Sequence, residues 1–421
     1  MVSSPARSIP VVLQQHLDDT LAQRNTRSVL LRAPHVRLRH LSRLDERLSA
    51  SLDGLGIGDE AARDLCLSAL ASPSRGAIFA AALIAIGHQN RALLDKLLAV
   101  VETVPELESA LTSAFGWTAA RSLRGISKPL LESDVALHRR IGIASCRLHQ
   151  VNPGNLLSEA VSKPSPWRVE ALTTAGRLGR IDLLSNCKSA LEGADTQVSV
   201  AAARAALLLG DRDRAIVVLN GHAAAAGPRQ VCDFMLVLKA MEPTAALAFL
   251  KSLAHDPAQL RLLIRGAGVS GNPHYIPWLI KQMADLKLTR LAGEAFSMIT
   301  GLDLAYIDFD TRPPEDAVFG PNDDPADADV AIDEDDSLPW PDVEKISAWW
   351  QAHGARFKPG TRYFVGEPPT IAHCLSVLKT GFQRQRIAAA EYLCLLQPGT
   401  PLFNVAAPAW RQERLLAQMG A

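Results

Sequence analysis

Apolar residues recur along most of the chain at the spacing of helices that bury one side. In the first 60 residues, Leu38, Leu41, Leu44 and Leu48 form one apolar stripe, and charged residues fill the other faces. Steps of three and four residues place side chains on the same face of an α-helix. We therefore predict helices over residues 11–24 and 36–52, and further helices along most of the chain. Because few runs favour strands, the predicted fold class is all-α.

Between residues 133 and 301, the helical pattern repeats six times at intervals of 29 to 33 residues. The repeats are anchored at Arg139, Arg168, Val198, Val231, Arg261 and Arg290. Each pair of helices is rich in alanine and leucine on more than one face, so it must pack against neighbouring pairs to bury its apolar surface. This pattern predicts an α-solenoid of HEAT-like helical repeats. An irregular helical bundle with accidental periodicity remains the alternative.

The ends of the repeated helices carry residues that favour helix termini. Gly176 and Gly210 follow apolar runs, where a helix commonly ends in a left-handed residue. Asp195 and Asp211 precede the next apolar runs and are predicted to cap the N-termini of the helices that follow.

An acidic segment interrupts the helical pattern and defines the predicted domains. Residues 308–336 hold twelve acidic residues, one arginine and four prolines. Such a composition disfavours a packed core. We predict a helical lead-in over 1–60, a repeat array over 61–301, an acidic linker over 302–341 and a helical C-terminal cap over 342–421. The linker either lies over a basic surface of the array or is exposed.

The overall composition fits a globular protein but indicates no specific ligand. The 421 residues are 48% hydrophobic and 21% charged, and 44 basic residues balance 44 acidic ones. This balance disfavours a dedicated nucleic-acid binder. The six cysteines show no metal or disulfide spacing. Five or six of them lie within apolar helical patterns and are predicted to be small buried side chains in a reducing compartment. No apolar run is long enough to span a membrane, and the predicted location is the cytoplasm.

No catalytic motif stands out, so the sequence predicts a binding protein rather than an enzyme. Phosphate-binding loops, zinc motifs and the nucleophile elbow are absent, and no cofactor or metal is predicted. The predicted role is a protein-binding scaffold with a protein partner. A HEAT-like DNA glycosylase or other nucleic-acid binder and a self-associating structural module are the alternatives. The candidate partner-binding residues combine repeat-face arginines with two tryptophans: Arg139, Arg168, Arg261, Arg290, Trp167 and Trp278.

Several short stretches resemble a family of bacterial HEAT-repeat proteins of unassigned activity, often encoded near type VI secretion genes. The matching stretches are LSRLDERL at 41–48, SDVALHRRIG at 133–142, LPWPD at 338–342, GTRYFVG at 360–366 and GFQRQR at 381–386. The resemblance implies a helical-repeat fold. It also implies an accessory role as an adaptor, chaperone or immunity-like protein whose partner is a secreted effector or its adaptor. It implies no catalytic residues. The segment QQHLDD at 14–19 departs from the family's acidic, alanine-rich opening.

Overall fold

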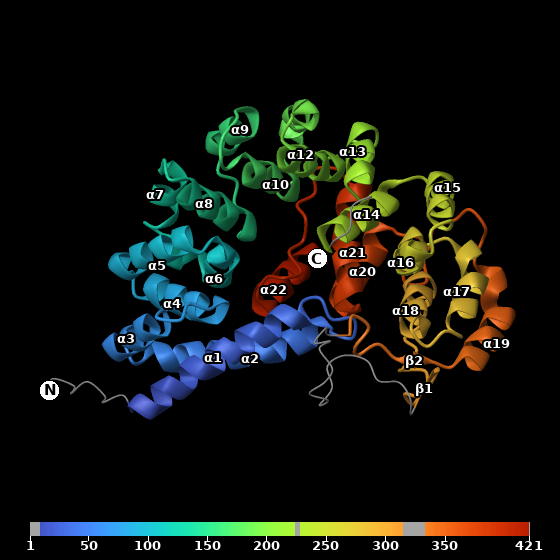
Figure 1. The fold of residues 1–421 in the computed structure, drawn as a ribbon, viewed down its shortest axis with the longest axis horizontal. Coiled ribbons are helices and arrows are strands. Elements are labelled where there is room, and N and C mark those ends of the chain that lie inside the picture. The colour runs from blue at the N-terminus through green and yellow to red at the C-terminus, as the bar shows by residue number, and fades with distance from the viewer. Residues whose placement is uncertain (1–8, 224–227, 315–332, 421) are drawn as a thin grey trace. The chain divides into compact units, whose positions relative to one another are not determined.

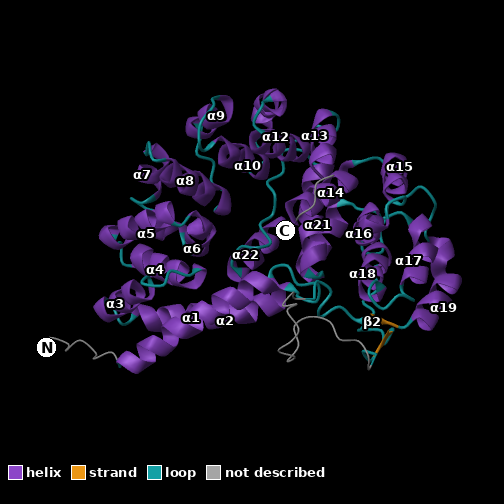
Figure 2. Cartoon of the chain, in the orientation of Figure 1, coloured by secondary structure: helices purple, strands orange, loops and turns teal. Residues whose placement is uncertain are grey.

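The helices form where the apolar spacing predicts them. The computed structural model describes residues 9–223, 228–314 and 333–420, and these residues contain 22 α-helices and almost no strand (Figure 2). The fold class is all-α, as predicted. Of the two N-terminal helices, α1 (Pro10–Leu30) covers the predicted span 11–24, whereas α2 (Leu38–Gly56) begins two residues later than the predicted span 36–52. The predicted leucine stripe of α2 is buried. None of the described helices is both long and apolar enough to cross a membrane.

The chain divides into two compact units (Figure 1). The first contains residues 1–210 and 398–421, and the second contains residues 211–397. The second unit therefore contains the end of the predicted array, the predicted linker and the beginning of the predicted cap, so neither predicted boundary, at 301 or at 341, separates the two units. The predicted cap, 342–421, is divided between the two units, because its last 24 residues pack on the first.

In the first unit, alternate helices pack one upon the next: α4 on α6, α6 on α8, α8 on α10, and α10 on α12. After α1 and α2, its helices are α3 (Glu60–Ala69), α4 (Arg75–Gly87), α5 (Arg91–Thr103), α6 (Glu108–Trp117), α7 (Ser127–Glu132), α8 (Ala136–Leu148), α9 (Asn155–Ser162), α10 (Arg168–Arg177), α11 (Leu184–Ser189), α12 (Thr196–Leu208) and α22 (Ala409–Met419).

The second unit packs α14 on α16 and α16 on α18 in the same manner. Its elements are α13 (Arg214–Ala223), α14 (Pro228–Ala240), α15 (Pro243–Leu253), α16 (Leu260–Ser270), α17 (Ile276–Gln282), α18 (Thr289–Thr300), α19 (Val343–His353), α20 (Ile371–Thr380) and α21 (Gln383–Leu396), with the antiparallel pair β1 (Asp310–Thr311) and β2 (Trp340–Pro341).

The predicted helix ends are partly confirmed. Asp195 accepts hydrogen bonds from the backbone N–H groups of Gln197 and Val198, and Asp211 accepts one from Ala215. Gly210 has a φ of 110°, as its predicted position requires. The prediction for Gly176 was wrong, because this residue lies within α10 and the left-handed residue is Gly179. A Cβ on Gly176 would lie 2.6 Å from Ala205 Cα, so this glycine permits the close packing of α10 on α12.

In each unit, a returning segment of the chain binds the carbonyl groups at the C-termini of packed helices. In the first unit, the guanidinium of Arg411 donates to the carbonyl oxygens of Gly116 at 2.7 Å and Thr118 at 2.8 Å. In the second unit, Arg362 donates to the carbonyl oxygens of Leu238 and Ser270 at 3.0 and 3.1 Å. Since the last carbonyl groups of a helix lack intrahelical partners, these arginines replace the missing donors.

Five of the six cysteines are buried, and Cys232 is exposed. Burial raises the pKa of the thiols of Cys66, Cys187, Cys374 and Cys394 to about 12, and that of Cys146 to about 11. The thiolate is the reactive form of cysteine, so these five thiols should be unreactive.

We expect an aromatic disulfide reagent to modify the exposed Cys232 rapidly in the native protein, and the five buried cysteines only after unfolding. Mass mapping of the modified peptide checks this prediction; rapid labelling of any buried cysteine would contradict it.

Candidate functional site

Two of the predicted partner-binding residues, Arg139 and Trp167, meet at a pocket in the first unit. The guanidinium carbon of Arg139 lies 4.2 Å from the ring centroid of Trp167. At this distance the cation attracts the electrons of the indole ring, an interaction worth about 0.5–2 kcal/mol. Their proximity follows from the short helix α9, which returns the chain so that residue 167 lies beside α8.

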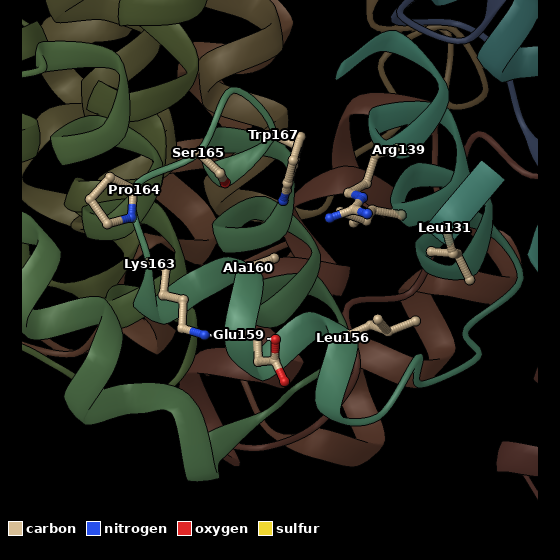
Figure 3. A pocket seen from close by; sticks show the side chains of 10 residues that line it. Leu131, Arg139, Leu156, Glu159, Ala160, Lys163, Pro164, Ser165 and Trp167 are labelled. Atoms are coloured by element: carbon tan, nitrogen blue, oxygen red, sulfur yellow. Dashed lines mark ion pairs between the residues drawn. The ribbon is translucent and has the colours of Figure 1, made fainter. Parts of the chain in front are cut away.

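The pocket has a volume of about 180 Å³ and combines apolar walls with a few polar groups. Its lining comes from α7, α8, α9 and the loop between α9 and α10: Leu131, Arg139, Ile143, Leu156, Glu159, Ala160, Lys163, Pro164, Ser165 and Trp167. Figure 3 shows these side chains around one space, with the ion pair of Glu159 and Lys163 at the lower rim. Leu156 is 42% exposed, so apolar surface is open to solvent at this position.

Two polar atoms at this pocket are buried without a hydrogen-bond partner. They are Nε of Arg139 and the hydroxyl oxygen of Ser165. Among the described residues, Arg139 forms an ion pair with Asp134, whose carboxylate oxygen lies 3.8 Å from Nη2, beyond hydrogen-bond distance. A buried polar group without a partner costs about 1–3 kcal/mol. A ligand that supplies an acceptor to Arg139 Nε and a partner to Ser165 would remove this cost.

The loop that carries Ser165 was not predicted as part of a site, although the sequence holds a signal for it. Pro164 and Pro166 flank Ser165, and proline fixes its own φ and restricts the residue before it. These prolines keep residues 163–166 out of the helices on both sides, so that the loop forms one wall of the pocket. Glu159 and Leu156 give no such signal, because they are typical residues of a short helix.

The other candidate residues lie elsewhere and are engaged within the protein. Arg168 donates from Nε to the carbonyl oxygen of Val161 at 3.0 Å. Trp278 is partly buried against the core of the second unit, with its ring 6.3 Å from that of Tyr275. Arg261 and Arg290 bind Asp333 and Asp335 of the acidic linker. The structure thus brings Arg139 and Trp167 together at the pocket, and Arg261 and Arg290 together at Asp335. Arg168 and Trp278 have separate contacts.

The acidic residues 333–335 bind arginines of α16 and α18. Arg261 Nη2 contacts both carboxylate oxygens of Asp335 at 2.8 Å, Arg265 Nη2 contacts Glu334 at 2.8 Å, and Arg290 Nη2 contacts Asp333 at 2.6 Å. We call residues 333–335 the acidic clasp. Of the two alternatives for the linker, docking on a basic surface is confirmed for these residues. Residues 315–332 of the linker lie outside the described residues.

Several other arginines of the first unit form ion pairs between helices or within a loop. Arg140 binds Glu108 at 2.7 Å and Arg147 binds Glu170 at 2.8 Å, each joining two packed helices. Arg180 binds Asp182 at 2.6 Å. These guanidinium groups already contact carboxylates, which leaves less positive charge for tracking phosphates.

Comparison with protein-family models, curated proteins and solved structures finds no match to this chain.

Proposed function

We propose that the chain is a non-enzymatic protein-binding scaffold, and that the pocket around Arg139 and Trp167 receives an acidic side chain of the partner protein. The observation that carries the proposal is the pair of unpartnered buried atoms, Arg139 Nε and Ser165 Oγ, in one pocket. A carboxylate would accept from the guanidinium and from the hydroxyl. Charge-assisted hydrogen bonds of this kind are stronger than those between neutral groups.

The helix packing supports a repeat scaffold of the HEAT-like solenoid type. Alternate helices follow one another through α4, α6, α8, α10 and α12, and the sequence period of about 30 residues corresponds to one helical pair. In such arrays each pair offers side chains along an extended surface. The resemblance to secretion-linked proteins extends the proposal to the partner, a secreted effector or its adaptor.

Site-specific crosslinking tests this proposal directly. A photoreactive amino acid at Leu156, which is exposed at the pocket, should capture the partner in cells of the native host. The same amino acid at Val217, which is 71% exposed in the second unit, is the matched control and should not. Combining the Leu156 probe with Arg139→Gln should reduce the captured amount about tenfold, because a charge-assisted hydrogen bond is lost.

Three outcomes would contradict the proposal. One is equal capture by the two probe positions. Another is capture that Arg139→Gln leaves unchanged. The third is recovery of nucleic acid, with salt-sensitive retention, in place of a polypeptide, which would favour the nucleic-acid alternative.

A further inference from the structure

A second pocket of the first unit combines arginine with aromatic side chains, and no carboxylate lines it. Its volume is about 170 Å³. The pocket lies among α1, α4, the C-terminal parts of α6 and α8, and the returning segment 404–408. Its lining includes Arg24, Phe79, Trp117, Leu148, Asn404 and Pro408. It shares no residue with the pocket around Arg139.

The two arginines of this pocket differ in their partners. Arg27 is neutralised by Asp45, whose carboxylate oxygens lie 2.6 and 3.1 Å from Nε and Nη2. Among the described residues, the Arg24 side chain hydrogen-bonds only to the Ser28 hydroxyl, at 3.1 Å. It lies over the Phe79 ring with a centroid distance of 5.9 Å. No carboxylate among the described residues pairs with Arg24. Burial, followed by the positive charges of Arg75 and Arg27, lowers the pKa of Arg24.

Other groups of the pocket suit a small anion with an apolar body. The carbonyl oxygen of the Asn404 side chain accepts from the backbone N–H of Ala406, while its amide nitrogen has no partner among the described residues. Phe79, Leu148 and Pro408 supply apolar wall, and Phe79 is only 3% exposed. An apolar cavity of about 150 Å³ accommodates benzene. The pocket is therefore large enough for one ring or a short aliphatic chain.

From this geometry we infer that the pocket is a binding site for a carboxylate carried on a small apolar body. The carboxylate binds the guanidinium of Arg24, with the Asn404 amide as a second donor, and the apolar body contacts Phe79 and Trp117. The ligand is either a free small-molecule acid or the C-terminal carboxylate of a peptide ending in an apolar residue. Both sources supply the same chemistry to Arg24.

Benzoate is the probe for this site, and its neutral isostere benzamide is the ligand control. We expect benzoate, titrated into the full-length protein, to shift the methyl NMR signals of Leu31 and Leu148, which line the pocket. Benzamide should bind at least tenfold more weakly, because it cannot accept a charge-assisted hydrogen bond.

Arg24→Gln should weaken benzoate binding about tenfold to a hundredfold, because a hydrogen bond to a charged group is lost. The melting temperature should be preserved, since an uncompensated charge is removed. Arg121→Gln, an exposed arginine in the 3₁₀ turn Ala120–Leu123, is the matched control and should keep full affinity.

Peptide probes distinguish the two sources. Stronger binding of Gly-Gly-Phe than of benzoate, lost on C-terminal amidation, would assign the ligand to a chain terminus; the reverse order would assign it to a small acid. The inference is overturned if benzoate does not bind, if benzamide binds as well, if Arg24→Gln retains the affinity, or if inorganic phosphate binds as tightly as benzoate.

Discussion

Replacing Asp45 by asparagine should lower the free energy of unfolding of the first unit by about 3–5 kcal/mol, the range found when one partner of a buried ion pair is removed. Asp45 is 3% exposed. It accepts two hydrogen bonds from Arg27 and one, at 2.7 Å, from the backbone N–H of Ala409, the first residue of α22. Asparagine leaves the charge of Arg27 buried without a counter-charge. The NH₂ group of asparagine cannot accept the hydrogen bonds that Arg27 and the Ala409 N–H donate to the carboxylate.

Hydrogen exchange locates the expected effect. Arg27 also donates to the carbonyl oxygens of Ala406 and Ala407, so the ion pair joins α1 and α2 to the C-terminal segment. In Asp45→Asn, the backbone amides of α1, α2 and α22 should exchange faster, while those of the second unit should be unchanged. Chemical denaturation followed by circular dichroism gives the loss of stability.

Asp64→Asn is the matched control in the same unit. Asp64 pairs with Arg63 at 3.1 Å, but its side chain is 66% exposed. Pairs of this kind contribute about 0–1 kcal/mol. Equal losses in the two variants would contradict the buried-pair argument. A second check combines Arg27→Met with Asp45→Asn. The double variant should be more stable than Asp45→Asn alone, because the unpaired charge of Arg27 is removed and the two residues of an ion pair do not contribute additively.

The helices could be predicted from the sequence because their causes are local. The leucine stripe of α2 and the N-cap of Asp195 depend on residues within a few positions of each other. The error at Gly176 shows the limit of local reasoning. Gly176 does not end its helix but allows α12 to pack closely on α10, and the residue that it contacts, Ala205, lies 29 residues further along the chain.

The arginine partners could not be predicted, because they come from distant segments. Arg27 contacts residues near position 406, and Arg290 contacts Asp333 across 43 positions. The helical period places an arginine on a face of the array. Which arginine binds a carboxylate or carbonyl group depends on the path of residues 333–335 and 404–408 over the helices. Arg139 and Arg261 hold comparable positions in the repeat, yet only Arg261 receives a carboxylate at hydrogen-bond distance. A sequence without an alignment does not give that path.

Replacing Asp335 by asparagine should lower the free energy of unfolding of the second unit by about 1.5–3 kcal/mol, the range for hydrogen bonds to charged groups. The loss stays below that of a fully buried ion pair, because the Arg261 side chain is 37% exposed and solvent can compensate its charge. Asp335 is 2% exposed and binds Arg261 through both carboxylate oxygens. Its backbone carbonyl also accepts from Arg290, which lies over the ring of Trp340 at 4.6 Å. Hydrogen exchange should increase in α16 and α18 and remain unchanged in α1 and α2.

Glu334→Gln is the matched control within the acidic clasp. The Glu334 side chain is 65% exposed although it lies 2.8 Å from Arg265, so its removal should cost little. The hydrogen bond from Arg265 lowers the pKa of Glu334. The small contribution of Glu334 to the free energy of unfolding is therefore present above the usual pKa of a glutamate, and it is lost as the pH falls through the lowered pKa.

The outcome for Asp335→Asn also bears on partner binding. A large loss of stability would mean that Arg261 and Arg290 serve to hold the acidic clasp, which leaves Arg139 and Trp167 as the predicted contacts for a partner. If Asp335→Asn instead has no more effect than Glu334→Gln, the clasp contributes little to folding. An acidic segment of another protein could then replace it at α16 and α18, and Arg261 and Arg290 would regain their predicted role as partner-binding residues.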